Sequence, residues 1–536
     1  MKVYKLSKSA LYATIPTAII TPIVFSGCKD ECKNDDKPNV IFILMDDAGY
    51  GDFSCYGQTK TETPNIDALA ESGILFTDMY SNCPVSAPSR GCLMTGQHMG
   101  HAQIRDNINI NYAEGEAVWW FDTIDSHPEA EAQMGLEPGT PTLASKLKEA
   151  GYTTAMVGKW GLGGEVNNSA PWDMGFDLFY GYICQRMAHN YYPQYLWKNN
   201  QKDYINPIEI VTHPGTKLNP GADPYDIHSY DKFTKGKVHA AEPIYANVID
   251  FVRSNKDNPF FLMWTTNIPH SPLLAPEEWV EKYVAKYGDE EPLTGEKCRT
   301  HQFPHNYYPC RYPHATYSAM ISYFDNQVGE LVKELKRLGI YENTLIIVTS
   351  DNGPANNASS PTVWMDSAAP YRCGKGWGKR TLKEGGIRMP FIVSWPAKMD
   401  GGETSNHIGY FADIMPTLCE LAGVESPQTD GISILPTLLG EKEKQNEHEF
   451  LYWEFPDYGG QIAVRMGEWK GIIENMHAGN RTMQLFNISK AGKDIESPEN
   501  DVASQHPEIV ERMWRYIEQS HIHPTIEKFQ IDITRK

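Results

Sequence analysis

Several features are absent from this 536-residue sequence, and each absence excludes a class of protein. Its ten cysteines include no Cys-x-x-Cys pair, which argues against a zinc site built from thiolates. No apolar run is long enough for a membrane-spanning helix, so we do not expect an integral membrane protein. Positive charge is scarce, since 48 Lys and Arg against 68 Asp and Glu give a net charge of −20, which argues against a nucleic-acid partner. With 41% hydrophobic and 22% charged residues, the composition is that of a globular protein.

The first residues have the pattern of an export signal. A lysine-rich start precedes an apolar stretch, and small residues then lead to Cys28. This pattern resembles a bacterial lipoprotein signal, with residues 1–27 removed, Cys28 lipidated and residues 28–37 forming a polar tether. An ordinary signal peptide with an incidental cysteine is the alternative. We therefore expect an exported protein, in the periplasm or on the outer-membrane surface, that contacts the membrane only through the lipid at Cys28.

Short apolar runs rich in β-branched residues predict strands buried in a parallel sheet. They are Asn39–Met45, Thr153–Val157, Pro259–Trp264, Thr344–Ser350 and Pro390–Trp395. Helical patterns fall between these runs, at Pro141–Ala150, Tyr323–Leu338 and Tyr410–Ala422. Strands that alternate with helices predict an α/β fold with a large, doubly wound, parallel or mixed sheet flanked by helices.

The sequence changes in character after about residue 440. Four short strand patterns and an amphipathic helix predict a small antiparallel sheet with one helix packed on it. They are Phe450–Glu454, Ala463–Met466, Trp469–Ile473, Met483–Ile488 and Pro507–Ser520. We therefore predict a main α/β domain over residues 38–440 and a C-terminal α+β subdomain over residues 441–536.

Polar side chains follow two of the predicted strands. Asp46 and Asp47 come directly after the first strand, and Asp351 and Asn352 come directly after Thr344–Ser350. Because ligands bind at the carboxyl ends of parallel strands, we expect these side chains to meet at one edge of the sheet. Adjacent carboxylates repel unless a cation lies between them, and oxygen ligands without His or Cys favour Ca²⁺ or Mg²⁺ over zinc. Taken alone, Asp46-Asp47 is equally compatible with a helix cap, but the second acidic strand end favours a metal site.

The next notable motif is Ser86-Ala87-Pro88-Ser89-Arg90. Pro88 suits the first turn of a helix, which places Ser86 at or just before the helix N-terminus. The helix dipole favours developing negative charge at that position. In isolation, the motif is also compatible with a simple capping turn.

Together, these and further motifs resemble the type I, formylglycine-dependent sulfatases of the alkaline-phosphatase superfamily. The resemblance extends from about Pro38 to Ile517. The further motifs are Thr63-Pro64-Asn65-Ile66-Asp67, Leu93 with Thr95-Gly96, Gly158-Lys159-Trp160, Pro269-His270-Ser271-Pro272, Ser350-Asp351-Asn352-Gly353, and Lys379 with Glu384-Gly385-Gly386-Ile387-Arg388. The resemblance implies a sulfuric ester hydrolase whose main domain is catalytic and whose substrate is a sulfated carbohydrate.

The resemblance also implies a chemical role for Ser86. In this family the first residue of the motif is oxidised to formylglycine (3-oxoalanine), and a serine implies a maturing enzyme of the serine type. One hydroxyl of the hydrated aldehyde attacks sulfur and expels the alcohol, and the other then loses its proton and releases sulfate. The implied cation is Ca²⁺, with Mg²⁺ as the alternative. Its implied ligands are Asp46, Asp47, Asp351, Asn352 and residue 86.

Other matched positions imply contacts with the reacting groups. Asp351 is a candidate base for the hydroxyl, and Arg90 is expected to hold the hydrate. Lys159, His270 and Lys379 match the positions that contact sulfate, where fixed positive groups stabilise developing charge. His270, or Lys379, is the expected proton donor to the leaving alcohol.

One motif departs from the family pattern. The family commonly has Gly-Lys-Trp-His-Leu-Gly, whereas this chain has Gly161 in place of the histidine that contacts formylglycine. His189 is our candidate replacement, although a purely structural role is the alternative. Arg186 and Asn190 lie in the same polar and aromatic stretch, which suits sugar recognition because rings stack on pyranose faces and amides bond to hydroxyls.

Two other functions are compatible with parts of the sequence. The first is a phosphomonoesterase or phosphodiesterase on the same fold, which would use an unmodified Ser or Thr beside two zinc ions. Such a site needs several histidines and acids at strand ends, and this chain offers few histidines there. The second is a glycan-binding lipoprotein that has lost catalysis, which the complete set of metal and sulfate positions argues against.

Overall fold

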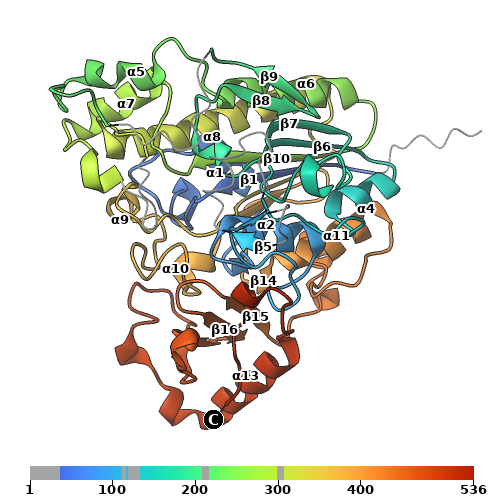
Figure 1. Cartoon of the computed structure of the whole chain (residues 1–536). Helices are drawn as coiled ribbons and strands as arrows, with labels where there is room; N and C mark the ends of the chain where they lie inside the picture. The colour runs from blue at the N-terminus through green and yellow to red at the C-terminus, as the bar shows by residue number, and fades with distance from the viewer. Residues whose placement is uncertain (1–36, 112–115, 119–132, 208–216, 299–306, 536) are drawn as a thin grey trace, which may run out of the picture. The chain divides into compact units, whose positions relative to one another are not determined.

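A computed structural model describes residues 37–111, 116–118, 133–207, 217–298 and 307–535 (Figure 1). From Lys37 onward the chain forms one compact unit. The expected signal peptide, the expected lipidation site at Cys28 and nearly all of the expected tether lie outside the described residues. Within the described ranges, no helix is long and apolar enough to cross a membrane.

A ten-stranded sheet runs through the unit in the order β13-β2-β12-β11-β1-β10-β6-β7-β8-β9. Its central strands, from β11 to β7, are parallel to one another, whereas β12 on one side and β8 on the other are antiparallel to their neighbours. The mixed sheet predicted from the sequence is thereby confirmed. The strands are β1 (Asn39–Asp46), β2 (Ile74–Phe76), β6 (Thr153–Lys159), β7 (Leu178–Tyr182), β8 (Tyr195–Lys198), β9 (Gln201–Tyr204), β10 (Phe260–Pro269), β11 (Thr344–Ser350), β12 (Phe391–Ser394) and β13 (Glu403–Ser405).

Helices cover both faces of this sheet, as the alternating side chains of β1 require. Ile41, Ile43 and Met45 pack into one core with α1, α6 and α8, whereas Val40, Phe42 and Leu44 pack into a second core with α2, α4 and α11. The sheet is therefore doubly wound, and all six of these side chains are fully buried. The covering helices are α1 (Pro64–Glu71), α2 (Ser86–Thr95), α4 (Leu143–Glu149), α6 (Ala241–Asn255), α8 (Pro313–Leu338) and α11 (Ile414–Ala422).

Two central elements are longer than the sequence predicts. Strand β10 continues through the polar residues Thr265, Thr266 and Asn267, which are buried in the sheet. Helix α8 begins at Pro313, ten residues before the predicted start at Tyr323. Its first turns bury small polar residues as well as apolar ones, so the usual amphipathic pattern is missing there. The helix ends at Leu338, as predicted, and Gly339 follows it in the left-handed conformation (φ +74°).

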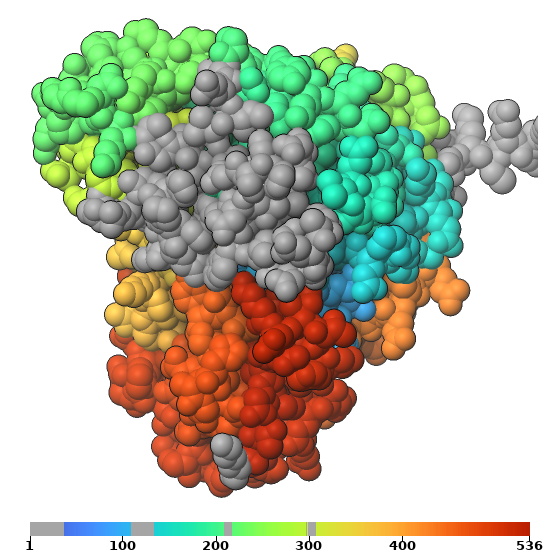
Figure 2. All heavy atoms as spheres, viewed as in Figure 1, coloured from blue at the N-terminus to red at the C-terminus, as the bar shows by residue number. Residues whose placement is uncertain are grey.

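The C-terminal residues form the small antiparallel sheet predicted from the sequence, at one end of the face seen in Figure 2. One side of this sheet packs against helix α13, and the other side packs Trp453, Phe455 and Ile472 against Leu382 and Ile387 of the main part of the chain. The elements are β15 (Leu451–Phe455), β16 (Gln461–Met466), β17 (Trp469–Ile473), β18 (Gln484–Asn487) and α13 (Pro507–Ser520).

Candidate active site

Strands β1 and β11 bring the two acidic strand ends together. They pair in parallel with Met45 opposite Ser350, so both motifs leave the sheet at the same edge. The Asp47 backbone N–H donates to Asp351 Oδ1 (3.2 Å), and Asn352 Nδ2 donates to Asp47 Oδ1 (2.7 Å). The side chains of Asp46, Asp47, Asp351 and Asn352 are all buried.

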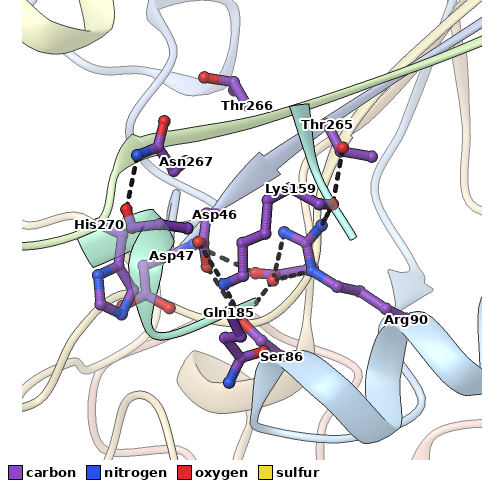
Figure 3. A network of polar contacts seen from close by, with 12 residues as sticks. Asp46, Asp47, Ser86, Arg90, Lys159, Gln185, Thr265, Thr266, Asn267 and His270 are labelled. Atoms are coloured by element: carbon purple, nitrogen blue, oxygen red, sulfur yellow. Dashed lines mark hydrogen bonds and ion pairs between the residues drawn. The ribbon is translucent and has the colours of Figure 1, made fainter. Parts of the chain in front are cut away.

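Ser86, the first residue of α2, lies in the middle of these acids (Figure 3). Its Oγ donates to Asp351 Oδ2 at 2.6 Å, and it lies 3.0 Å from Asp46 Oδ1 and 3.4 Å from Asn352 Oδ1. Oxygens from both strand ends therefore converge on the hydroxyl of residue 86.

The start of α2 is held by contacts on two sides. The Asn107 side chain accepts a hydrogen bond from the Ala87 backbone N–H (2.9 Å), which satisfies one of the amides that a helix N-terminus leaves unpaired. Ser89 Oγ donates to the Asp351 carbonyl oxygen (2.6 Å), which ties the same turn to the end of β11. The position of Ser86 relative to the acids is therefore fixed by backbone contacts.

Two buried cations lie beside the acids. Arg90 Nε donates to Asp351 Oδ2 (2.9 Å), and Arg90 Nη1 donates to the Lys159 carbonyl oxygen (3.1 Å). Lys159 Nζ is 2.6 Å from Asp46 Oδ2 and 3.3 Å from Ser86 Oγ. Lys159 ends strand β6, so it reaches the site from the same edge of the sheet as the acids.

A third cation reaches the site from a loop. Lys379 Nζ donates to Asp47 Oδ1, and the Lys379 backbone N–H donates to the Pro354 carbonyl oxygen (2.9 Å). The lysine lies between β11 and α10 (Glu384–Ile387) in the chain. Each of the three acids thus faces one cation, so the net charge of the cluster is close to zero before any ligand binds.

The environments of the acids differ in their effect on protonation. Burial raises the pKa of Asp46, but the charges of Lys159, His270 and Arg90 outweigh burial and hold this pKa well below its usual range. Burial and the neighbouring Asp46 raise the pKa of Asp351 to about 6. Of Asp46 and Asp351, Asp351 is therefore the one that exchanges a proton closer to neutral pH, and it is also the one that accepts the shorter hydrogen bond from Ser86.

His270 forms the opposite wall of the site. Its Nδ1 lies 2.6 Å from the Ser271 carbonyl oxygen, which identifies Nδ1 as the protonated nitrogen, while Nε2 lies 3.6 Å from Asp47 Oδ2. The His189 ring stacks on the His270 ring, with centroids 4.3 Å apart and planes 10° apart. Tyr307 contacts both rings edge-on, and burial lowers the pKa of His270.

The other two residues of the predicted sugar-binding stretch, Arg186 and Asn190, are also buried. The Asn190 side-chain oxygen accepts a hydrogen bond from the Tyr192 backbone N–H (2.9 Å), and its carbonyl oxygen accepts one from Tyr182 Oη (2.7 Å). These contacts show that Asn190 helps to hold the loop that carries His189.

Comparisons with known proteins agree with this geometry. A sequence profile described as Sulfatase matches residues 38–424. The chain belongs to the sulfatase family. A second profile, described as N-sulphoglucosamine sulphohydrolase, C-terminal, matches residues 374–521, which include the C-terminal sheet.

The chain is similar to several sulfatases along much of its length. It is 28% identical to N-acetylgalactosamine-6-O-sulfatase of Bacteroides thetaiotaomicron, over 92% of this chain and 96% of that protein. It is also 28% identical to N-acetylgalactosamine-6-sulfatase of Rattus norvegicus, over 75% of this chain but only 66% of the rat protein. A solved structure of a 6S-sulf protein from a Bacteroides thetaiotaomicron locus for the metabolism of multiple glycosaminoglycans superposes with a TM-score of 0.66, at 26% identity over 90% of this chain and 99% of that chain.

A divalent cation suits the donors at this sulfatase site. Three carboxylates and the Asn352 amide oxygen form a set of hard oxygen donors, of the kind that binds Ca²⁺ or Mg²⁺. Asp46, Asp47 and His270 offer ligand atoms within 4.8 Å of one another. In the part of the chain that the structure describes, His270 is the one histidine in this group, whereas a two-zinc phosphatase site needs several.

The site also contains residues that sequence reasoning missed. Gln185 directly precedes Arg186 in the polar and aromatic stretch, but no feature of the sequence assigns it a role. Asn107 follows Arg105-Asp106, and no motif in the sequence links it to Ser86. Tyr307 lies in a loop with no recognisable sequence pattern. Only the path of the folded chain brings these three side chains to the site.

Proposed function

We propose that this protein hydrolyses sulfate esters of carbohydrates, with formylglycine formed from Ser86 as the nucleophile and Ca²⁺ as the bound cation. The observation that carries this proposal is the 2.6 Å hydrogen bond from Ser86 Oγ to Asp351, inside a buried group of oxygen donors. The relatives are named as sulfatases of 6-sulfated N-acetylgalactosamine, so N-acetylgalactosamine 6-sulfate is the first substrate to test.

The residues around Ser86 suit the first chemical step. Asp46, Asp47, Asp351 and Asn352 would hold the cation, with residue 86 as a further ligand. When bound, the cation would polarise the sulfate oxygens, and hydrated formylglycine would supply the attacking hydroxyl. Asp351 accepts the proton of that hydroxyl, because it already accepts the hydrogen bond from Ser86 Oγ and has a raised pKa.

The cations and His270 suit the binding of sulfate and the departure of the alcohol. Lys159 and Lys379 bind the sulfate oxygens, since each already approaches one acid of the cluster with its charged end. His270 faces the site with Nε2 and, once this nitrogen is protonated, delivers that proton to the leaving alcohol oxygen, with Lys379 as the alternative donor. His189 and Arg186 contact the sugar, and Asn190 supports their loop.

The test uses protein made in a host that has a serine-type maturing enzyme. The peptide containing residue 86 should be lighter by two hydrogen atoms, and the protein should release sulfate from N-acetylgalactosamine 6-sulfate. Ser86→Ala should abolish release but leave the fold intact, as measured by circular dichroism. Sulfate release by the Ser86→Ala variant would contradict the nucleophile assignment. An unmodified Ser86 in a protein that cleaves 4-nitrophenyl phosphate would favour the phosphatase alternative.

We further propose that the chain is exported and lipid-anchored in the bacterial envelope. The basic start, the apolar stretch and the small residues before Cys28 support this proposal. In cells fed an alkyne-tagged fatty acid, the wild-type protein should carry the label and fractionate with membranes. Cys28→Ser should carry no label, and a labelled variant would contradict the anchor site.

A further inference from the structure

The loop after β7 covers the position where this chain has Gly161 instead of histidine. Parallel pairing continues beyond the ends of β6 and β7, because the Trp160 backbone N–H donates to Tyr182 O (2.9 Å) and the Gly161 N–H donates to Ile183 O (3.0 Å). This pairing carries Gln185 next to Gly161. A Cβ added to Gly161 would lie 3.2 Å from Gln185 Oε1 and 3.4 Å from Gln185 Cβ. Gln185 therefore occupies the space that a side chain at position 161 would enter.

The Gln185 side chain has an unused hydrogen-bonding group. The residue is 4% exposed, and its Oε1 has no hydrogen-bond partner in the described part of the chain. Leaving such an acceptor unpaired costs about 1–3 kcal/mol, so a buried orphan of this kind calls for a ligand that completes it. The Gln185 backbone N–H donates to Gln133 Oε1 (2.5 Å), which helps to fix the residue in place. Figure 3 shows the Gln185 side chain beside Ser86.

We propose that Gln185 is a catalytic residue whose amide oxygen accepts a hydrogen bond from the second hydroxyl of hydrated residue 86. This inference rests on the proposed formylglycine function. Ser86 has a single hydroxyl proton, which Asp351 accepts at 2.6 Å, and hydration adds one further O–H donor that needs an acceptor. A neutral amide supplies that acceptor without adding a fourth carboxylate to the site. His189, the candidate from the sequence, stacks on the His270 ring.

The first test measures the hydrate without turnover. Methoxyamine forms an oxime with the free aldehyde of residue 86 but not with its hydrate, so the rate of oxime formation reports the balance between the two. Loss of the Gln185 hydrogen bond should shift this balance toward the aldehyde. Gln185→Ala should therefore react about 3- to 10-fold faster than the wild type at equal formylglycine content. An unchanged rate overturns the assignment, whatever the substrate of the enzyme is.

The second test measures turnover of N-acetylgalactosamine 6-sulfate by variants with equal formylglycine content. Gln185→Ala should lower kcat about 10- to 100-fold and leave KM within twofold, because the residue orients the nucleophile rather than the sugar. The matched control is Gln327→Ala, which removes a buried glutamine of helix α8 and should keep the wild-type kcat. A loss confined to KM would overturn the proposal. A fully modified wild type that releases no sulfate from any sulfated sugar would contradict the proposed function instead, and the oxime rates would still decide the role of Gln185.

The third test places histidine at position 161, with and without the Gln185 side chain. Gly161→His alone should lower kcat, because the new side chain meets Gln185 and because Gly161 has φ +79°, where side chains are strained. In the Gln185→Ala background the histidine has room, and it should raise kcat at least threefold above Gln185→Ala alone. The two substitutions are thus expected to be strongly non-additive. Equal effects of Gly161→His on kcat in the wild-type and Gln185→Ala backgrounds would overturn the idea that side chains at positions 161 and 185 compete for the same space.

Discussion

The two lysines of the site are held by different parts of the molecule. Lys159 ends strand β6 in the parallel core of the sheet and is 1% exposed. Lys379 lies in a loop and is 8% exposed. We call the strand-end residues Asp46, Asp351 and Lys159 the strand half of the site, and the loop that carries Lys379 the loop half.

The loop half is supported by the C-terminal sheet. Gln461 of β16 donates from Nε2 to the Arg380 carbonyl oxygen (3.0 Å), and its Oε1 accepts from the Leu382 N–H (3.2 Å). Lys470 of β17 lies 2.7 Å from Glu384, just beyond the loop, and is fully buried. Main-chain pairing thus positions the strand half, whereas side chains some 80 residues further along the chain position the loop half. The main α/β region therefore depends on the C-terminal sheet for the position of Lys379, one of the three cations of the site.

Removal of the cation should have the largest effect, and it should act through the strand half. EDTA should lower sulfate release by about 1,000-fold or more, because the sulfate loses its polarising charge while three acids remain beside it. Added Ca²⁺ should restore release to the wild type but not to Asp46→Asn, which lacks one ligand. Elemental analysis before and after EDTA gives the metal content. Full activity in protein with no measurable divalent metal would contradict the cation site.

Replacement of each lysine by methionine separates the two halves in stability. Lys159→Met leaves Asp46 buried without its cation, and this should lower the free energy of unfolding of the metal-free protein by about 3–5 kcal/mol. Lys379→Met should lower it less, because the loop lies closer to solvent and Asp47 keeps its bond from Asn352. Urea unfolding at neutral pH measures both. Equal decreases in the free energy of unfolding of the two variants would show that the two lysines contribute equally to stability.

The same division explains what the sequence predicts and what it does not. β1 and β11 are continuous apolar runs, so their pairing and the meeting of Asp46 with Asp351 follow from the pattern of a parallel sheet. The end of β10 was missed because its buried polar residues look like a loop. Gln185 and Gln461 were not predicted because their roles depend on the path of loops and on side-chain contacts between distant segments. The role of Lys379 came from family resemblance alone, since no periodicity marks that loop.

A substitution that weakens the support of the loop half without changing a charged residue should have a moderate effect on catalysis. Gln461→Ala removes both hydrogen bonds to the loop and should lower kcat/KM about 10-fold, mainly through KM, because Lys379 is less well placed to bind sulfate. Metal content should stay at the wild-type value, since none of the proposed metal ligands lies in the loop half. Gln445→Ala is a matched control, because that glutamine also bridges backbone groups but lies elsewhere, near Ser433. A loss of metal in Gln461→Ala would mean that the two halves are not independent.

The smallest effect concerns Asp52, an acid close to Asp47 in the chain that faces no cation. Burial raises its pKa from 3.8 to about 7, and its partners are the neutral donors Gly49 N–H and Tyr317 Oη. Because the folded state favours the protonated form, the stability of the wild type should fall as pH rises from about 4 through about 7. Asp52→Asn should remove this fall and raise the free energy of unfolding by about 1–3 kcal/mol at pH 8, with little change near pH 4. Urea unfolding at both pH values measures this difference in the free energy of unfolding. A variant that is no more stable than the wild type at pH 8 would show that other groups stabilise the charged form of Asp52. Since Asp46 is equally buried but keeps its charge, nearby cations rather than burial decide which acids can act as ligands.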